Sequence, residues 1–137
     1  MADLRPILLV EDSPKDLELT LAALEKCQLA NEIIVARDGE EALDYLYARG
    51  GHADRPDGDP AVVLLDLKLP KIDGLEVLEQ VKGDANLRHI PIVMISAYPD
   101  AHASAAAVGA DAFVAKPFAI EEMLATVAAL LPADPGS

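Results

Sequence analysis

The stretch Ala61-Val62-Val63-Leu64-Leu65-Asp66 decides the fold, because it is an unbroken apolar run that ends on a carboxylate. A short apolar run between prolines is typical of a strand that is buried on both faces. An ionised side chain is costly inside such a strand, so Asp66 is expected at its carboxyl end, where the chain leaves the core. A second run, Ile7-Leu8-Leu9-Val10, ends in the same way on Glu11-Asp12. The two runs together predict a cluster of carboxylates that needs a cation.

The composition indicates one acidic globular domain. A chain of 137 residues is long enough for one domain with its own core, and 52% hydrophobic content argues against disorder. Eleven basic residues against 24 acidic ones give a net charge of −13, so nucleic acids and anionic membranes are not expected partners. Most of this acidity is explained by a well-solvated surface.

Cysteine and histidine usage excludes several kinds of site. Cys27 is the single cysteine, so neither an internal disulfide nor a thiolate zinc site can form, and the three histidines show no ligand spacing. No signal-type segment precedes Pro6 and no run approaches a membrane span. We therefore expect a cytoplasmic protein that forms a single domain over residues 1–137, with a frayed tail at residues 132–137 and no output domain.

Strands and helices are predicted to alternate along the whole chain. The predicted strands cover residues 6–12, 33–36, 61–66, 92–95 and 112–115. The predicted helices run from Pro14 to near Cys27, from Asp38 through Leu46, from Leu75 through Val81, from Pro99 to Gly109 and from Ile120 through Leu130. Residues 49–60, rich in glycine, proline and aspartate, are predicted to be a mobile surface loop.

Five repeats of strand and helix demand an α/β fold with a doubly wound parallel sheet. The common strand order for such a (βα)5 sheet is 2-1-3-4-5, and ligands bind beyond the carboxyl ends of strands 1 and 3. In the first helix, Ser13 is the expected N-cap, Asp16 completes a capping pattern, and Leu17, Leu21 and Leu24 form the inward stripe. In this strand order the carboxyl ends of strands 1 and 3 are neighbours, so Glu11, Asp12 and Asp66 are expected to meet there.

The expected acid cluster selects the kind of metal. Neighbouring carboxylates raise one another's pKa unless a cation lies between them. All-oxygen ligands without Cys or His favour Mg²⁺, with Mn²⁺ as a substitute, over zinc or copper. A few protein oxygens leave coordination positions open for water or a substrate oxygen, as is common where a phosphate is bound.

Two further strand ends supply groups that bind phosphate. Ser96 follows the fourth strand with a hydroxyl, and Lys116 follows the fifth with an ammonium. No activated Ser, Cys or His competes as a nucleophile, so Asp66 is the group expected to be phosphorylated. Each residue alone has an ordinary explanation: a helix cap or turn for Asp66, a turn hydroxyl for Ser96, a surface cation for Lys116. Their coincidence at four strand ends favours the phosphate site.

These residues carry a resemblance to a known family. The chain resembles the CheY-like receiver domains of two-component response regulators over roughly residues 5–131. The matching motifs are Leu8-Leu9-Val10-Glu11-Asp12, Leu65-Asp66-Leu67-Lys68-Leu69-Pro70 with Asp73-Gly74, Ile95-Ser96-Ala97, Gly109-Ala110-Asp111-Ala112-Phe113 and Val114-Ala115-Lys116-Pro117-Phe118. The resemblance implies a flavodoxin-like fold and a phosphoacceptor signalling protein that catalyses only its own phosphorylation and dephosphorylation.

The resemblance also implies the role of each metal ligand. Asp66 accepts a phosphoryl group from a phosphohistidine of a histidine kinase. Asp12, Asp66 and the backbone carbonyl of Lys68 bind Mg²⁺ directly, and Glu11 acts through water.

For the bound phosphoryl group, the resemblance implies that Ser96, the backbone N–H of Ala97 and Lys116 hold its oxygens. Ser96 and Phe113 form the conformational switch, and Lys116-Pro117 is a cis peptide. Phe113 departs from the tyrosine of many members, so a hydroxyl contact to a partner is lost.

Lys68 and Tyr98 flank the path of hydrolytic water in the family. The lifetime of the phosphorylated state is therefore not carried over from the family.

Because the chain ends soon after the last helix, we expect a stand-alone receiver that acts on another protein. Residues 49–60 and 41–46 look similar to regulators paired with bacterial phytochrome kinases.

The last two helices predict an interface. Alanines and other uncharged residues fill the outward positions of both, which is unusual in so acidic a chain. A homodimer or effector surface is expected on helix 4, strand 5 and helix 5. Its candidate residues are Val108, Phe113, Ala125, Ala128 and Ala129. The alternative is that small residues merely let helices pack closely.

Two other classes of function use a related sequence pattern. A phosphoaspartyl hydrolase would need a second aspartate two residues after the nucleophile, where this chain has Lys68, and a cap over the substrate. A flavodoxin-like electron carrier would need a first loop rich in hydroxyls and glycine, whereas residues 11–15 are acidic.

Overall fold

The structure is a computed structural model that describes residues 5–26, 31–54, 59–69, 71–97, 101–116 and 119–130. The predicted frayed tail at residues 132–137, the predicted helix start at Pro99-Asp100 and the proline of the predicted cis peptide, Pro117, lie outside these ranges. No helix in the described ranges has the length and apolar character needed to cross a membrane.

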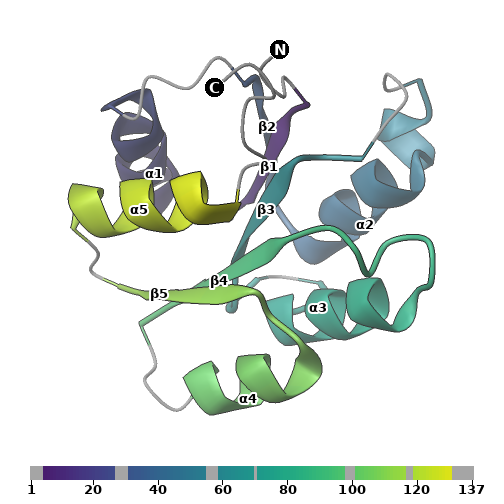
Figure 1. The fold of residues 1–137 in the computed structure, drawn as a ribbon. Helices are drawn as coiled ribbons and strands as arrows, with labels where there is room; N and C mark the ends of the chain where they lie inside the picture. Colours follow the sequence, from purple (N-terminus) through teal and green to yellow (C-terminus); the bar gives the residue numbers. More distant parts are fainter. Residues whose placement is uncertain are drawn as a thin grey trace, which may run out of the picture.

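Five parallel strands form one sheet in the order β2-β1-β3-β4-β5, as predicted (Figure 1). They are β1 (Ile7–Val10), β2 (Ile33–Ala36), β3 (Val62–Asp66), β4 (Ile92–Ser96) and β5 (Ala112–Ala115). The first strand is shorter than predicted, because the pairing of β1 with both neighbours stops at Val10. Glu11 and Asp12 therefore lie just beyond the edge of the sheet.

Helices cover both faces of this sheet. They are α1 (Pro14–Lys26), α2 (Gly39–Tyr47), α3 (Gly74–Gly83), α4 (Ala101–Val108) and α5 (Ile120–Leu130). Figure 1 shows α1 and α5 on one face and α2, α3 and α4 on the other. Successive strand residues therefore enter opposite cores: Leu8 and Val10 pack toward α2 and α3, and Ile7 and Leu9 toward α1 and α5.

The central strand β3 is buried along its whole length. Each fully buried Leu or Val side chain contributes about 1.5–3 kcal/mol of transfer free energy. Asp66 is the last residue of β3 and is itself buried, with 6% of its surface exposed. A strand that is buried throughout and paired on both sides thus fixes the position of this carboxylate.

The inward face of α1 differs in part from the predicted leucine stripe. Leu24 is buried, but Leu17 and Leu21 are only partly buried against the core, and Thr20 and Ala23 are buried beside them. Thr20 can be buried because its hydroxyl donates to the carbonyl of Asp16 at 2.9 Å. The predicted cap is confirmed, since the Asp16 amide donates to Ser13 Oγ at 3.4 Å.

The predicted loop at residues 49–60 contains a short 3-10 helix, η1 (Gly50–His52), so it is not entirely irregular. His52 Nε2 lies 3.1 Å from Glu41 Oε2, and its ring meets the Tyr45 ring edge-on at 5.3 Å between centroids. These contacts dock η1 on α2. Residues 55–58 of the loop lie outside the described ranges.

The connection from β3 to α3 is very tight. The Gly74 amide donates to the carbonyl of Leu67 at 2.7 Å, and Asp73 caps α3 by accepting from the Glu76 amide at 3.0 Å. A Cβ at position 74 would lie 2.2 Å from the carbonyl oxygen of Asp66, so only glycine fits there. The end of β3 and the start of α3 are therefore held as one unit.

Candidate functional site

A cleft of about 470 Å³ lies at the carboxyl edge of the sheet. The residues that line it are Glu11, Asp12, Ser13, Asp16, Asp66, Lys68, Leu69, Ser96, Ala97 and Lys116. All the side chains that the sequence predicted for the metal and the phosphoryl group are among them. The carboxyl ends of β1, β3, β4 and β5 thus converge on one cleft, as the strand order requires.

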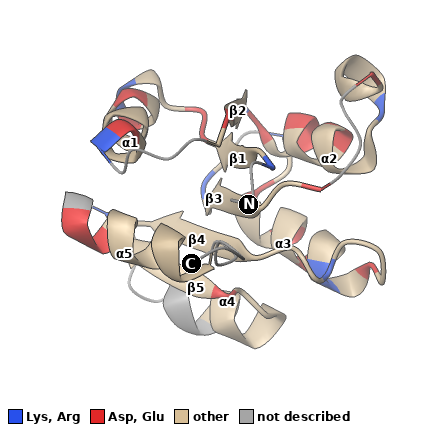
Figure 2. Ribbon diagram, turned by 45° about the horizontal axis from the view of Figure 1, so that its top comes forward, with Lys and Arg blue, Asp and Glu red and all other residues tan. Residues whose placement is uncertain are grey.

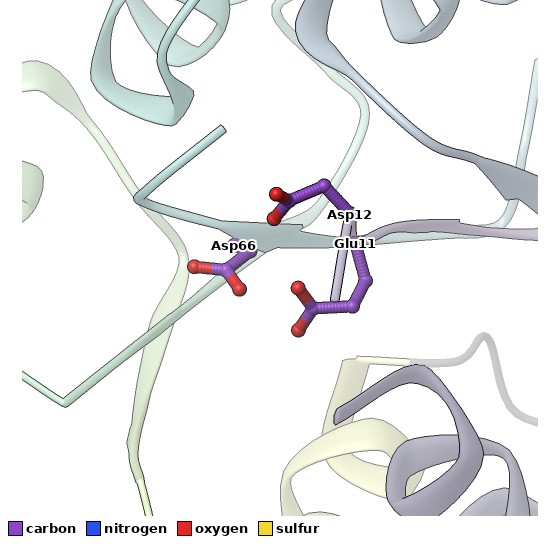
Figure 3. Close-up of side chains that lie close together, drawn as sticks. All are labelled: Glu11, Asp12 and Asp66. Carbon is purple, nitrogen blue, oxygen red and sulfur yellow. The ribbon is translucent and has the colours of Figure 1, made fainter. Parts of the chain in front are cut away.

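Three carboxylates gather in this cleft. Glu11, Asp12 and Asp66 each bring one oxygen to within 4.8 Å of the others, and Figure 3 shows the three side chains pointing toward one another. They meet because β1 and β3 are neighbours, with Val10 in register with Leu65. Glu11 and Asp66 are buried, and Asp12 is the more exposed of the three.

The ammonium of Lys116 reaches into the same cluster from the end of β5. Its Nζ lies 2.7 Å from Asp66 Oδ2, 3.0 Å from Glu11 Oε1 and 2.9 Å from Asp16 Oδ2. An ammonium has three N–H donors, so these three carboxylates can use all of them. One lysine therefore contacts three of the four carboxylates that line the cleft.

Backbone and side-chain donors fix the orientation of the carboxylates. The Lys68 amide donates to the second oxygen of Asp66 at 3.0 Å, and the Ser13 amide donates to Glu11 Oε2 at 3.2 Å. Arg37, just beyond the end of β2, donates from Nη2 to the backbone carbonyl of Asp12 at 3.2 Å. The acid cluster is thus preorganised by groups that carry no negative charge.

Crowding changes the proton affinity of two groups in the cleft. Burial raises the pKa of Glu11 to about 7, and the hydrogen bond to Asp66 adds to this more than the contact with Lys116 offsets. Burial alone would lower the pKa of Lys116, but its hydrogen bonds to Asp66, Asp16 and Glu11 outweigh burial and raise that pKa above its usual value. Lys116 therefore remains charged at neutral pH.

The donor set fits a hard divalent cation. Only oxygen ligands are offered, and neither histidine nor cysteine is found among the described residues that line the cleft. Two histidines engage carboxylates elsewhere: His52 contacts Glu41, and His89 lies 3.1 Å from Asp59. The trio of Glu11, Asp12 and Asp66 offers more negative charge than Lys116 compensates, and Mg²⁺ or Mn²⁺ would offset the remainder.

The raised pKa of Glu11 predicts a pH-dependent stability in the absence of metal. Between about pH 4.5 and about 7, the folded protein keeps a proton that the unfolded chain has released. The contribution of Glu11 to the free energy of unfolding is therefore fully present below pH 4.5. It falls, by up to about 3 kcal/mol in total, as the pH rises through 7. Urea unfolding in EDTA, followed by circular dichroism, should show this loss in the wild type. Glu11→Gln should lack it, and equal pH slopes in the two proteins would contradict the prediction.

Of the predicted switch residues, Ser96 lines the cleft and Phe113 does not, and the predicted interface residues also lie outside it. Phe113 is partly buried against the core on the side of α2, α3 and α4, in register with Met94, two residues before Ser96. Val108 is likewise partly buried there. Ala125, Ala128 and Ala129 are exposed on α5, as predicted.

The cleft also contains Asp16, which the sequence had indicated only as a capping residue. It lies in the first turn of α1, five positions after Glu11, and side chains on a helix tilt toward its N-terminus. A helix that begins directly at the end of β1 therefore directs this carboxylate back to the cleft. That geometric argument was available from the sequence.

A family model described as "Response regulator receiver domain" matches residues 7–128. A curated relative is the response regulator Rcp1 of Synechocystis sp., 41% identical over 90 residues. The match covers 66% of this chain and 60% of Rcp1, so the chain spans less than two thirds of that relative's length.

Solved structures show the same likeness. The bacteriophytochrome response regulator RtBRR superposes with a TM-score of 0.89 at 47% identity, over 98% of this chain and 84% of that one. The bacteriophytochrome response regulator AtBRR superposes with a TM-score of 0.87 at 55% identity, over 98% of this chain and 99% of that one. The Mn²⁺-bound form of Rcp1 superposes with a TM-score of 0.79 at 31% identity, over 94% of this chain and 99% of that one.

Proposed function

The chain belongs to the response regulator receiver domains of two-component signalling, and from this premise we propose that it accepts a phosphoryl group on Asp66 from a phosphohistidine of a histidine kinase. One observation carries the proposal: the Asp66 carboxylate ends the central strand, where Lys116 and two further carboxylates meet it. The protein is then a phosphoacceptor that turns over no other substrate. The proposal includes a cytoplasmic location.

Asp66 is the best placed of the four carboxylates to act as nucleophile. One of its oxygens accepts from Lys68 and the other from Lys116, so its orientation is fixed. Glu11 is more deeply buried than Asp66, and burial raises its pKa, so it is partly protonated at neutral pH and a weaker nucleophile. Asp16 contacts Lys116 from the rim of the cleft. The central position and the two fixed oxygens favour Asp66.

In the transfer step, a carboxylate oxygen of Asp66 attacks the phosphorus. The P–N bond of the phosphohistidine breaks, and the imidazole leaves with the electron pair. Lys116 then donates to a phosphoryl oxygen, and Ser96 and the amide of Ala97 donate to the others. Phosphoryl transfer depends on such positioned donors more than on covalent chemistry.

Asp12, Asp66 and the carbonyl of Lys68 would hold Mg²⁺, with Glu11 acting through water. The bound ion supplies positive charge for the phosphoryl oxygens. Two observations support this assignment: the all-oxygen donor set of the cleft and the Mn²⁺ bound by the related Rcp1.

The proposal is tested with acetyl phosphate, which can replace the kinase as donor. Incubation with Mg²⁺ should give one phosphate adduct in intact-mass analysis, and peptide mapping should place it on Asp66. In EDTA the adduct should be lost, because nearly two further negative charges enter an acidic cleft. Full phosphorylation in EDTA would contradict the metal assignment.

Ser96 and Phe113 would transmit the change to α4, β5 and α5. Ser96 is buried at the end of β4, and Phe113 lies on the adjacent strand, so a shift of one can be followed by the other. The proposed cis peptide at Lys116-Pro117, whose proline is outside the described residues, would direct the lysine inward.

A kinase of the phytochrome type is the proposed donor, because the similar structures RtBRR and AtBRR are bacteriophytochrome response regulators. The match to AtBRR over 99% of its length supports a single receiver domain as the working unit. The output then reaches an effector protein or a second copy of the chain.

The face of α4, β5 and α5 is the proposed dimer surface. Neither α4 nor the part of α5 beyond Glu121 and Glu122 contains Lys, Arg, Asp or Glu, and Figure 2 shows α5 in tan beyond its acidic first turn. Ala125, Ala128 and Ala129 are exposed there, and Leu124 is 39% exposed. Apolar surface of this kind is typical of a face that another protein covers.

Ala128→Glu is expected to convert a dimer into a monomer, because it places an unpaired carboxylate in that face. Light scattering of the phosphorylated and unphosphorylated forms gives the mass. Ala22→Glu, at an exposed alanine of α1, is a matched control that should leave the mass unchanged. An unchanged mass for Ala128→Glu would remove the dimer from the proposal.

A further inference from the structure

Asp16 forms a contact that neither metal binding nor the phosphoryl acceptor requires. Its Oδ2 accepts from Lys116 Nζ at 2.9 Å, a distance that lies between those from the same ammonium to Asp66 and to Glu11. It stands outside the trio of Glu11, Asp12 and Asp66 whose oxygens cluster. The third donor of Lys116 is thus taken by a carboxylate of α1.

The position of Asp16 is fixed by its own helix. The Thr20 hydroxyl donates to the Asp16 carbonyl at 2.9 Å, and the Asp16 amide donates to the capping Ser13 at 3.4 Å. The carboxylate therefore reaches Lys116 from the first turn of α1, and the ion pair ties that turn to the end of β5.

Among the three partners of Lys116, Asp16 is the most readily released. Its side chain is 38% exposed, against 4% for Glu11 and 9% for Asp66. A carboxylate that returns to water recovers its hydration, whereas a buried one without its cation is strongly destabilising. An incoming group that needs a donor from Lys116 would displace Asp16 first.

A phosphoryl group on Asp66 is such an incoming group. It adds nearly two negative charges and three strong acceptor oxygens to the cleft. With every N–H of Lys116 already directed at a carboxylate, binding a phosphoryl oxygen requires that one be given up. Asp16 also repels the phosphoryl group, so both effects act in the same direction.

We propose that Asp16 is a positioning residue that holds Lys116 in the unphosphorylated state and competes with the phosphoryl oxygens for its ammonium. This inference rests on the proposed function. Asp16 thereby restrains phosphorylation of Asp66, and the first turn of α1 is released from β5 when phosphorylation occurs.

The test measures the initial rate of phosphorylation by acetyl phosphate with saturating Mg²⁺ in the full chain. Asp16→Asn should raise this rate about two- to fivefold, the range expected for loss of one partly exposed ion pair. Asp16→Glu restores the carboxylate and should return most of the restraint. Glu18→Gln removes the same charge from an exposed position of α1 outside the cleft and should leave the rate unchanged.

Two further measurements separate this role from a general effect. Calorimetric Mg²⁺ affinity should be the same in Asp16→Asn and Glu18→Gln, and a rate increase explained by altered metal affinity overturns the proposal. Acylation of lysines at alkaline pH, read by peptide mapping, should increase at Lys116 in Asp16→Asn relative to Lys82. Unchanged labelling of Lys116 in Asp16→Asn overturns the proposal. If the wild type is phosphorylated, a rate in Asp16→Asn that is equal to or below the wild-type rate also overturns it.

The failure of the proposed function is distinguishable from these outcomes. A wild type that takes up no phosphate in Mg²⁺ overturns the proposed function and, with it, the competition for the phosphoryl oxygens. Lys116 labelling then decides the remaining claim, that Asp16 tethers the lysine.

Discussion

Asp66→Asn is expected to abolish phosphate uptake from acetyl phosphate in Mg²⁺, by a factor of more than about 10³. The amide has the shape of the carboxylate but offers no anionic oxygen to attack phosphorus. The variant should still fold, because the amide removes one like charge from the neighbourhood of Glu11. Intact-mass analysis of protein incubated with the donor gives the answer directly.

Asp73→Asn is the matched control for this substitution. Asp73 caps α3 beside the same connection, and asparagine caps helices as well as aspartate does. It should be phosphorylated at the wild-type rate. An adduct of undiminished yield in Asp66→Asn would remove Asp66 as the acceptor, and loss of the adduct in both variants would indicate a disturbed fold.

Lys116→Met is expected to destabilise the metal-free protein by about 3 kcal/mol at pH 8, because it leaves buried Glu11 and Asp66 without their cation. Mg²⁺ should restore much of this loss by supplying positive charge to the same carboxylates. Urea unfolding with and without Mg²⁺ measures both effects.

Lys82→Met provides the comparison. Lys82 is also a partly buried lysine, which donates to Asp111 at 2.8 Å and to the carbonyls of Arg88 and Ile90 at 3.1 and 2.8 Å. These contacts lie away from the cleft, so its destabilisation should not respond to Mg²⁺ beyond the wild-type response. If the two variants respond equally to Mg²⁺, Lys116 does not balance the acid cluster.

The strands were predictable because short apolar runs that alternate with helical patterns are typical of buried strands. Residues 61–66 could be placed from their unbroken run of apolar residues. Asp66 lies at the strand end because a carboxylate is excluded from the middle of a strand that is buried on both faces. The alternation of strands and helices predicted a parallel sheet, and its strand order was taken as the common one for a doubly wound fold. The convergence of Glu11, Ser96 and Lys116 on one cleft is a consequence of that order.

Features that depend on tertiary contacts were not predictable in the same way. Thr20 is buried because its hydroxyl finds the carbonyl of Asp16, which no hydropathy pattern reveals. The 3-10 turn at Gly50–His52 is held by contacts to Glu41 and Tyr45 of α2 rather than by its own sequence. The contact of Asp16 with Lys116 joins residues that are 100 positions apart.

The separation between Lys116 and its partners has a consequence for how the chain folds. Glu11 and Lys116 are 105 residues apart, and β5, which ends beside the lysine, is the last strand in the chain and lies at the edge of the sheet. During synthesis the carboxylates of β1 and β3 are therefore completed before their compensating cation, and a partly folded sheet carries them unbalanced. β5 pairs with β4 rather than with β1, so the lysine reaches the carboxylates across β4 and β3. Docking of β5 completes the sheet and brings Lys116 to these carboxylates, so the last strand supplies both the final strand pairing and the compensating charge.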